Sequence, residues 1–218
     1  LVDCGLYQER QFKSRNWEPF DFPASDLDAV LLTHAHLDHC GLLPKLVKDG
    51  FKGRIFCTGA TAEIARIILL DAAKIQEEDA AFKRKRHKRE GREGPYPVEP
   101  LYTAADAETC FPLFSPVPYG QEVQVAPGIE ATFLDAGHVL GSSFIHVSTR
   151  INGDTRSVLF SGDIGRTDRP ILRDPQQIED GDYLLVESTY GDRVHGGRED
   201  IKAAVGEVIN ATRAAGGN

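Results

Sequence analysis

Six consecutive residues, His34-Ala35-His36-Leu37-Asp38-His39, contain three imidazoles and one carboxylate. They follow segment 27–33, whose apolar and β-branched residues predict a buried strand. In a loop at the end of a strand, His34 and His36 can face one metal ion while Asp38 and His39 face a second. Imidazole nitrogens and a carboxylate suit Zn²⁺ or Mn²⁺. The alternative is a solvated turn that is rich in histidine by chance, but the density of the pattern favours a metal site.

Two adjacent metal ions need more ligands than this loop offers, and two later strand ends can supply them. Asp135-Ala136-Gly137-His138 places a histidine in a tight turn, and Ser161-Gly162-Asp163 places a carboxylate that can bridge two ions. Taken alone, each residue reads more simply as a turn residue. Together they gain weight, because functional residues of α/β folds collect at the carboxyl ends of strands.

The elements that must position these residues include both helices and strands, which indicates a mixed α/β fold. Pro127-Gly128 and Asn152-Gly153 predict two hairpin turns in a β-rich second half. The apolar run 183–187 predicts a further buried strand. Strands are expected at 27–33, 54–57, 121–126, 129–134, 143–149, 156–161 and 183–187, and helices at 41–48, 61–82, 104–109 and 200–215.

Composition narrows the class of protein. The chain has 218 residues with 25 Lys and Arg against 33 Asp and Glu, a net charge of −8, which fits one domain or one domain and a piece of another. It contains no apolar run near the roughly 20 residues of a membrane span, and it begins with no signal peptide. Its four cysteines form no C-x-x-C pair, so the sequence suggests neither a zinc ribbon nor a disulfide framework. A reduced, cytoplasmic setting is expected.

The order of HAHLDH, Gly137-His138 and Ser161-Gly162-Asp163 resembles the metallo-β-lactamase fold, an αβ/βα sandwich with a dinuclear zinc site. Asp3, at the end of an early strand, matches an aspartate that orients the metal loop of that family from behind the ligands. The segment Glu187-Ser188-Thr189-Tyr190-Gly191-Asp192 is similar to motif A of the β-CASP nucleases, the branch that cuts nucleic acid. Its bacterial and archaeal RNA exonucleases also share the pattern of residues 135–142.

The resemblance covers essentially the whole chain and implies its organisation. Residues 1–190 would form an incomplete metallo-β-lactamase domain, and residues 191–218 would begin an inserted β-CASP domain. The chain then reads as a fragment that lacks the N-terminal strand and most of the β-CASP domain.

The resemblance also implies a site for two Zn²⁺ ions, with Mn²⁺ as the alternative. One ion would be held by His34, His36 and His138. The second would be held by Asp38, His39 and a histidine outside the chain, and Asp163 would bridge the two. Glu187 would position a second outside histidine as the general acid, so the catalytic residues would be Asp38, Asp163 and Glu187.

The substrate implied by the resemblance is RNA, cut from an end or internally, and DNA is not excluded. Two groups of residues are candidates for phosphate contacts. A basic run is expected either to contact the RNA backbone beside the cleft or to be a solvated helix end. Ser142 and Ser143 either contact a phosphate or cap a turn. The basic run consists of Lys83, Arg84, Lys85, Arg86, Lys88, Arg89 and Arg92.

Two other functions are alternatives to an RNA nuclease. A hydrolase of a small ester or thioester would share the HAHLDH loop but not the Glu187 motif. A non-catalytic β-CASP scaffold subunit would have lost ligands that are all present here. No membrane partner is expected, and a homodimer is left open.

Overall fold

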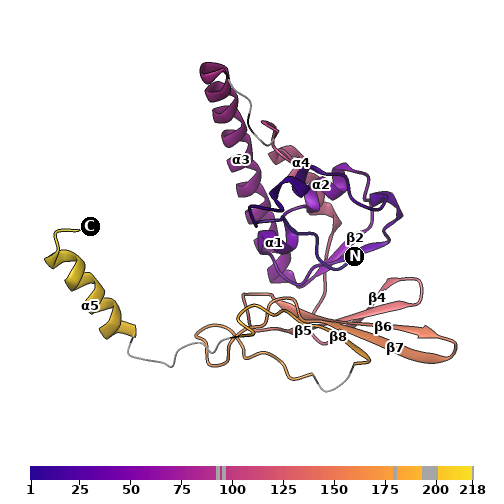
Figure 1. The fold of residues 1–218 in the computed structure, drawn as a ribbon. Coiled ribbons are helices and arrows are strands. Elements are labelled where there is room, and N and C mark those ends of the chain that lie inside the picture. Colours follow the sequence, from indigo (N-terminus) through magenta and orange to yellow (C-terminus); the bar gives the residue numbers. More distant parts are fainter. Residues whose placement is uncertain (92–93, 95–96, 179–180, 193–200, 218) are drawn as a thin grey trace. The chain divides into compact units, whose positions relative to one another are not determined.

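A computed structural model describes residues 1–91, 94, 97–178, 181–192 and 201–217. The chain divides into two compact units, Leu1–Glu187 and Ser188–Asn218. Within its described residues, 188–192 and 201–217, the second unit contains one helix, α5 (Ile201–Ala214). The first unit holds the remaining strands and helices (Figure 1). Among the described residues, no helix combines the length and the hydropathy that crossing a bilayer requires.

The strands of the first unit form two sheets. The small sheet is parallel and has the order β1 (Ala29–Leu31), β2 (Arg54–Cys57), β3 (Phe114–Pro116). The large sheet runs β4-β5-β6-β7-β8 and is antiparallel except that β8 runs parallel to β7. Its strands are β4 (Glu122–Ala126), β5 (Ile129–Asp135), β6 (Ser143–Ile151), β7 (Asp154–Phe160) and β8 (Tyr183–Leu185).

Both predicted hairpins are confirmed. Pro127-Gly128 joins β4 to β5, and Asn152-Gly153 joins β6 to β7. Asn152 and Gly153 both have positive φ, 54° and 92°, which is what a two-residue turn needs to match the twist of its strands.

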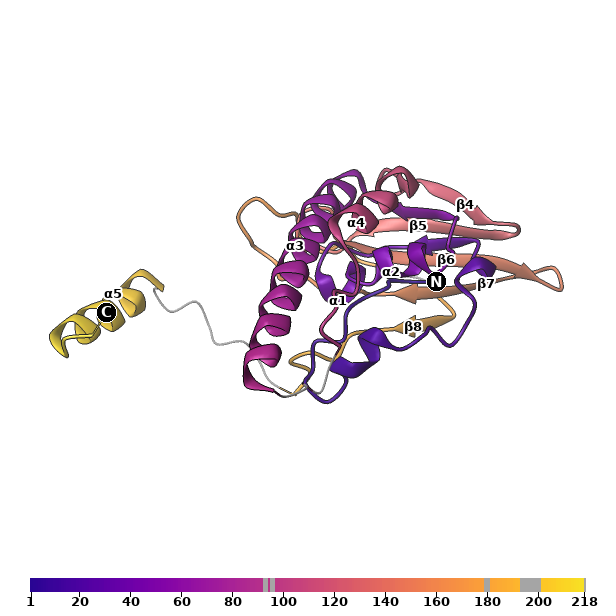
Figure 2. The ribbon, with the colours of Figure 1, turned by 90° about the horizontal axis from the view of Figure 1, so that it is seen from above.

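The small sheet lies between the helices and the large sheet. Successive side chains of a strand point to opposite faces, so each face of this sheet packs against a different layer. Val30 of β1 and Ile55 of β2 belong to one buried cluster with the helices. Leu31 and Phe56 belong to a second cluster, with Phe133 of the large sheet. The helices accordingly lie on one side of the sheets (Figures 1 and 2), and the layers confirm the α/β fold class. They are α1 (Leu37–Cys40), α2 (Leu43–Lys48), α3 (Gly59–Glu90) and α4 (Ala104–Cys110), with 3-10 turns at Lys13–Trp17, Ala24–Asp26 and Phe111–Leu113.

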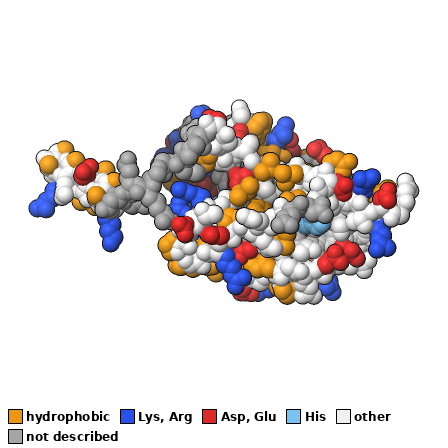
Figure 3. All heavy atoms as spheres, turned by 90° about the horizontal axis from the view of Figure 1, so that it is seen from below, with side chains coloured by type: hydrophobic (Ala, Val, Ile, Leu, Met, Phe, Trp, Pro, Cys, Tyr) orange, Lys and Arg blue, Asp and Glu red, His pale blue; other side chains and the backbone are white. Residues whose placement is uncertain are grey.

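The predicted burial of strand 183–187 is wrong. β8 lies at the edge of the large sheet, and its Leu184 is 60% exposed. The outer side of the large sheet carries no helix among the described residues of the first unit, and Figure 3 shows apolar side chains at the surface there. The apolar run identified the strand correctly, but the burial of a strand depends on a covering layer that its own sequence does not reveal.

Helix α3 is longer than the predicted helix 61–82. It begins at Gly59, where the Thr58 side chain accepts a hydrogen bond from the Thr61 amide. It ends at Glu90 and is followed by the C-cap residue Gly91, which has a φ of 62°. It therefore runs through most of the basic segment, because Lys and Arg are good helix formers. Pairs one turn apart support it there, such as Arg86 with Glu90 at 3.0 Å.

Candidate metal centre

The HAHLDH segment crosses from β1 into α1. His34 is fully buried, and His36 occupies the N-cap position of α1 with an extended backbone. Asp38 and His39 lie on the helix itself. The change from extended chain to helix within six residues turns the side chains toward one region instead of alternating them across a strand.

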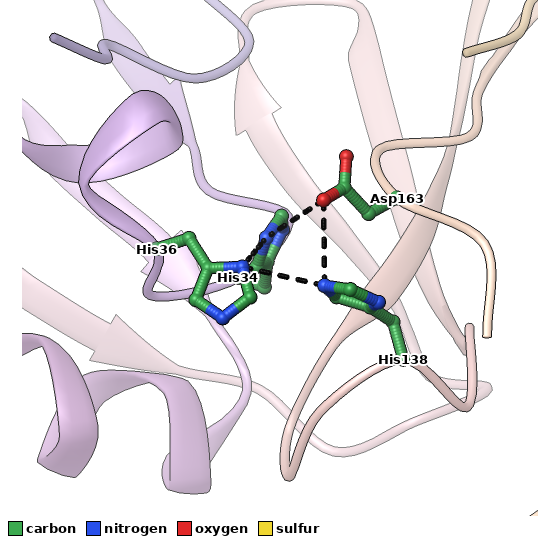
Figure 4. Close-up of side chains that lie close together, drawn as sticks. All are labelled: His34, His36, His138 and Asp163. Atoms are coloured by element: carbon green, nitrogen blue, oxygen red, sulfur yellow. Dashed lines mark hydrogen bonds and ion pairs between the residues drawn. The ribbon is translucent and has the colours of Figure 1, made fainter. Parts of the chain in front are cut away.

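Four side chains from three segments converge there (Figure 4). Ligand atoms of His34, His36, His138 and Asp163 all lie within 4.8 Å of one another. His138 Nε2 lies 3.3 Å from His36 Nδ1, and Asp163 Oδ2 lies 3.3 Å from His138 Nε2. His34 Nε2 lies 3.6 Å from the same Asp163 oxygen. Three nitrogens and one carboxylate oxygen are a donor set that suits Zn²⁺.

The other oxygen of Asp163 faces a different histidine. Asp163 Oδ1 lies 3.3 Å from His39 Nε2, and Asp38 Oδ2 lies 4.0 Å from that same nitrogen. The Asp38 side chain is 49% exposed, more than that of Asp163 or of His39. The carboxylate of Asp163 thus has one oxygen toward His34 and His138 and the other toward His39. A ligand that bridges two metal ions requires this arrangement.

Asp3 makes hydrogen bonds to this group, and the role that the resemblance implies for it stays a prediction. Its Oδ2 accepts a hydrogen bond from His39 Nδ1 at 2.7 Å. Its two oxygens also accept from the Thr33 amide and hydroxyl, each at 2.8 Å. Because Nδ1 of His39 carries the proton, its Nε2 presents a lone pair toward Asp163.

Thr33 is a functional residue that the sequence analysis missed. Its hydroxyl donates to Asp3, so it is left to accept from His34 Nδ1, 3.0 Å away. This fixes the tautomer of His34, with the lone pair on the Nε2 that faces Asp163. A threonine at the end of an apolar strand carries no signal of this role, which arises only from the fold.

Burial and neighbouring groups shift the pKa values of three of the imidazoles, and not all in the same direction. Burial, reinforced by the neighbouring His39, His36 and His138, lowers the pKa of His34 to about 2. Burial also lowers the pKa of His138, against the opposing charge of Asp163. Burial acts to lower the pKa of His39 as well, but the hydrogen bond and charge of Asp3 and the charges of Asp163 and Asp38 outweigh it and raise that pKa. Neutral imidazoles at His34 and His138 are the form that binds a metal.

The turn that carries His138 is fixed on both sides. Ser142 Oγ accepts from the amides of His138 and Val139 at 3.0 and 3.2 Å. The carbonyl of Gly141 accepts from the hydroxyls of Thr58 and Thr61 at 2.7 and 2.8 Å. A Cβ at Gly141 would meet the Thr61 amide at 2.5 Å, so only glycine fits this approach to the start of α3.

The serines of this turn do not face a ligand. Ser142 and Ser143 are each 1% exposed. The Ser142 hydroxyl already accepts hydrogen bonds from the amides of His138 and Val139. The Ser143 hydroxyl donates to the Thr33 carbonyl at 3.0 Å. The prediction that these serines contact a phosphate is therefore wrong, because both hydroxyls are buried and bonded to the chain's own backbone. The structure agrees with the alternative, in which they hold the turn.

Glu187 lies close to the centre and holds the loop of Asp163. Its Oε1 accepts from the amide of Ile164 at 2.5 Å, and its own amide donates to Ser161 Oγ at 3.0 Å. Its charge also acts on His138, opposing the lowering of that pKa. The carboxylate therefore has a positioning role within the described residues, in addition to the one that the resemblance implied.

The basic run lies far from the centre, which corrects its predicted place beside the cleft. Its residues follow one another at the distal end of α3 (Figure 1), and Arg92 lies outside the described residues. From Thr61, which contacts the His138 turn, to Lys83 the helix rises about 33 Å at 1.5 Å per residue. Part of the charge is paired along the helix, as Lys83 is with Asp79 at 3.8 Å.

Comparison with known proteins agrees with this geometry. A model of the metallo-beta-lactamase superfamily domain matches residues 1–174. Ribonuclease TTHA0252 of Thermus thermophilus is 34% identical over 217 residues, covering 100% of this chain and 44% of its own length. Transcription termination factor FttA of Methanocaldococcus jannaschii is 34% identical, covering 100% of this chain and 32% of its own. Cleavage and polyadenylation specificity factor 73 of Drosophila melanogaster is 32% identical, covering 92% and 26%.

The chain spans less than half of the length of these curated relatives. Among solved structures, a subclass B3 metallo-beta-lactamase from a soil metagenome library aligns with a TM-score of 0.41 and 17% identity, over 73% of this chain and 50% of that one. The curated relatives agree with the RNA-processing branch that the Glu187 motif indicated. With the family model matching most of its length, this chain belongs to the metallo-beta-lactamase superfamily.

Proposed function

We propose that this chain is the metal-binding part of a zinc-dependent ribonuclease that hydrolyses RNA phosphodiester bonds. His34, His36 and His138 would hold one zinc ion, and Asp38 and His39 would contribute to a second. Asp163 would bridge them. The observation that carries the proposal is the placement of Asp163, with Oδ2 3.3 Å from His138 and Oδ1 3.3 Å from His39.

Two zinc ions at such a centre supply Lewis acidity toward the phosphoryl oxygens and activate water for attack on phosphorus. The chain's own residues prepare the site for them. His34 and His138 are kept neutral by burial, so no proton has to leave them before they bind. Asp3 and Thr33 orient the rings of His39 and His34. Glu187 holds the loop that follows Asp163 and, by the motif A resemblance, would position a histidine outside this chain as general acid.

RNA is proposed as the substrate because the relatives include a ribonuclease and a cleavage and polyadenylation factor. The basic run of α3 lies at the far end of that helix, away from the metal centre. With a net charge of −8, the chain as a whole repels phosphates, so affinity for RNA must come from the metals, from individual cations and from parts of the longer protein. Whether cleavage begins at an end or internally is left to experiment.

The two alternatives are less well supported. A hydrolase of small esters would not need the Glu187 motif, and a scaffold subunit would not need an intact ligand set. Zinc as the metal and residues 191–218 as the beginning of a β-CASP domain are part of the proposal. So is a cytoplasmic location, which the four free, buried cysteines favour. A homodimer stays a prediction.

The test uses the complete protein, since the relatives extend well beyond this chain. End-labelled single-stranded RNA and DNA of the same sequence are incubated with wild type, with Asp163→Ala, and with Asp71→Ala as the matched control. Asp71 is an exposed aspartate of α3, outside the metal centre. Metal content is measured for each variant.

The proposal predicts that wild type and Asp71→Ala cut RNA, and that Asp163→Ala binds less metal and does not. The label pattern then distinguishes trimming from internal cuts. Cleavage of DNA alone would correct the substrate. A metal-loaded wild type that cuts neither polymer would overturn the nuclease and favour the small-ester hydrolase or the scaffold.

A further inference from the structure

A cavity of about 370 Å³ adjoins the turn that carries His138, and the proposed chemistry does not use it. The turn contributes Val139 and Leu140 to its lining. Three other segments complete it: 58–60 at the start of α3, 117–119, and 171–173. Its volume falls in the range of pockets that bind small organic groups.

The segments that line this cavity are tied to one another. Thr58 donates to the Gly141 carbonyl at 2.7 Å, and the Tyr119 hydroxyl donates to the Ser142 carbonyl at 2.8 Å. On the other side, the backbone amide of Gln176 donates to the backbone carbonyl of Asp135 at 2.8 Å. This bond anchors the chain just after residues 171–173. The cavity is therefore formed before any ligand arrives, and it is fixed relative to His138.

Two apolar side chains of the lining face solvent. Leu140 is 53% exposed and Ile171 is 90% exposed. Ile171 also has a φ of 76°, a backbone conformation that β-branched residues rarely adopt. Folding gains nothing from an exposed isoleucine in strained backbone, and such strain is found where a segment serves a ligand.

The remaining lining is mixed in a way that fits one class of ligand. Val117, Pro118 and Val139 add further apolar surface. Asp135, Tyr119 and the exposed Arg173 add an acceptor, a hydroxyl and a positive charge. A nucleobase has apolar faces and a polar edge of donors and acceptors. The phosphate on the sugar of the same nucleotide is an anion that Arg173 can pair with.

The position of the cavity sets which base could enter. Leu140 follows His138 by two residues, so their Cα atoms are at most about 7 Å apart. Stacked nucleotides advance by about 3.4 Å each. We infer that this cavity holds one nucleobase of the RNA, one or two nucleotides from the scissile phosphate, and so fixes where the strand is cut. The inference rests on the proposed ribonuclease function.

The test is a scan with RNAs of one sequence, each carrying a single abasic nucleotide. Binding to the metal-free complete protein is measured by fluorescence anisotropy, and KM and kcat are measured with metal. The variant combines Leu140→Ala with Ile171→Ala. The matched control is Ile67→Ala, which removes an isoleucine of α3 that is 69% exposed and lies outside the cavity.

We expect one abasic position to weaken binding to wild type roughly tenfold, the size typical of one recognised base. Ile67→Ala should keep this sensitivity, and the double variant should lose it. A flat scan on RNA that is nevertheless cut would overturn the base site alone. Equal sensitivity in wild type and the double variant would do the same. If the binding pattern appears but no RNA is cut, the base site stands and the ribonuclease proposal fails.

Discussion

Replacing Thr33 with valine tests how the metal centre is held in place. Valine matches the shape of threonine but removes the hydroxyl, which donates to Asp3 at 2.8 Å and accepts from His34 Nδ1 at 3.0 Å. The side chain is buried, so water cannot replace it. Asp3 keeps its bonds to the Thr33 amide and to His39, but the Nδ1 donor of His34 loses its partner.

The expected cost follows from these two bonds. A buried donor left without a partner costs on the order of 1–3 kcal/mol, and a hydrogen bond to a charged group contributes a similar amount. We take about 2 kcal/mol for the change, which corresponds to a roughly thirtyfold loss in metal affinity if it falls on the bound state. Removing partners of metal-binding histidines in other proteins has effects of about this size.

The assay separates folding from metal binding. Zinc affinity is measured by competition with a chromophoric chelator, and thermal unfolding of the metal-free protein is followed in parallel. Thr33→Ser is the matched control, because serine keeps the hydroxyl, and it should bind zinc like the wild type. A folded Thr33→Val that binds zinc within about twofold of the wild type would refute the reasoning.

Three further perturbations test other parts of the account. Gly141→Ala should destabilise the protein more than Gly153→Ala in thermal unfolding, because both glycines have positive φ but only a Cβ at Gly141 meets other atoms, the nearest at 2.5 Å; equal effects would mean that the turn moves freely from α3. Asp106→Ala should lower the free energy of unfolding by about 1 kcal/mol near neutral pH by removing a capping box. The backbone hydrogen bond from Thr103 lowers the pKa of Asp106, so its contribution is present above the ordinary carboxyl pKa of 3.8 and is lost as pH falls through the lower folded-state pKa; denaturant titrations at neutral pH and at about pH 3 should show the difference shrink, and a constant difference would contradict this cause. Glu187→Ala should weaken metal binding about tenfold, whereas Glu187→Gln, which keeps an acceptor for the Ile164 amide, should not; equal losses in a chelator titration would show that charge, not this hydrogen bond, is what matters.

Much of the candidate centre could be predicted from the sequence, because its residues occur at the ends of strands. His34, His36, His138 and Asp163 were expected to meet, and the structure brings them together. The hairpin turns could also be predicted, because the residues of such a turn are determined by its backbone conformation. Asn152-Gly153 is one of the few dipeptides that tolerate positive φ at both positions, so the local sequence determines the turn.

Features that depend on distant partners could not be predicted. Thr33 ends an apolar segment like many threonines, and its role appears only when Asp3 lies beside it. Ser142 and Ser143 face backbone atoms of their own turn and of Thr33, so exposure to a substrate could not be judged from their position in the sequence. The prediction that β8 is buried was wrong, because an apolar strand is buried only where another layer of the fold covers it, and its own sequence does not show whether one does.

The central claim is that Asp163 lies between two metal sites. Anomalous diffraction at the zinc edge, from crystals of the complete protein soaked in zinc, tests it directly. The account predicts two peaks about 3.5–4 Å apart, with one oxygen of Asp163 toward each and with His138 and His39 on different ions. A single peak, or two peaks that do not share Asp163, would contradict it.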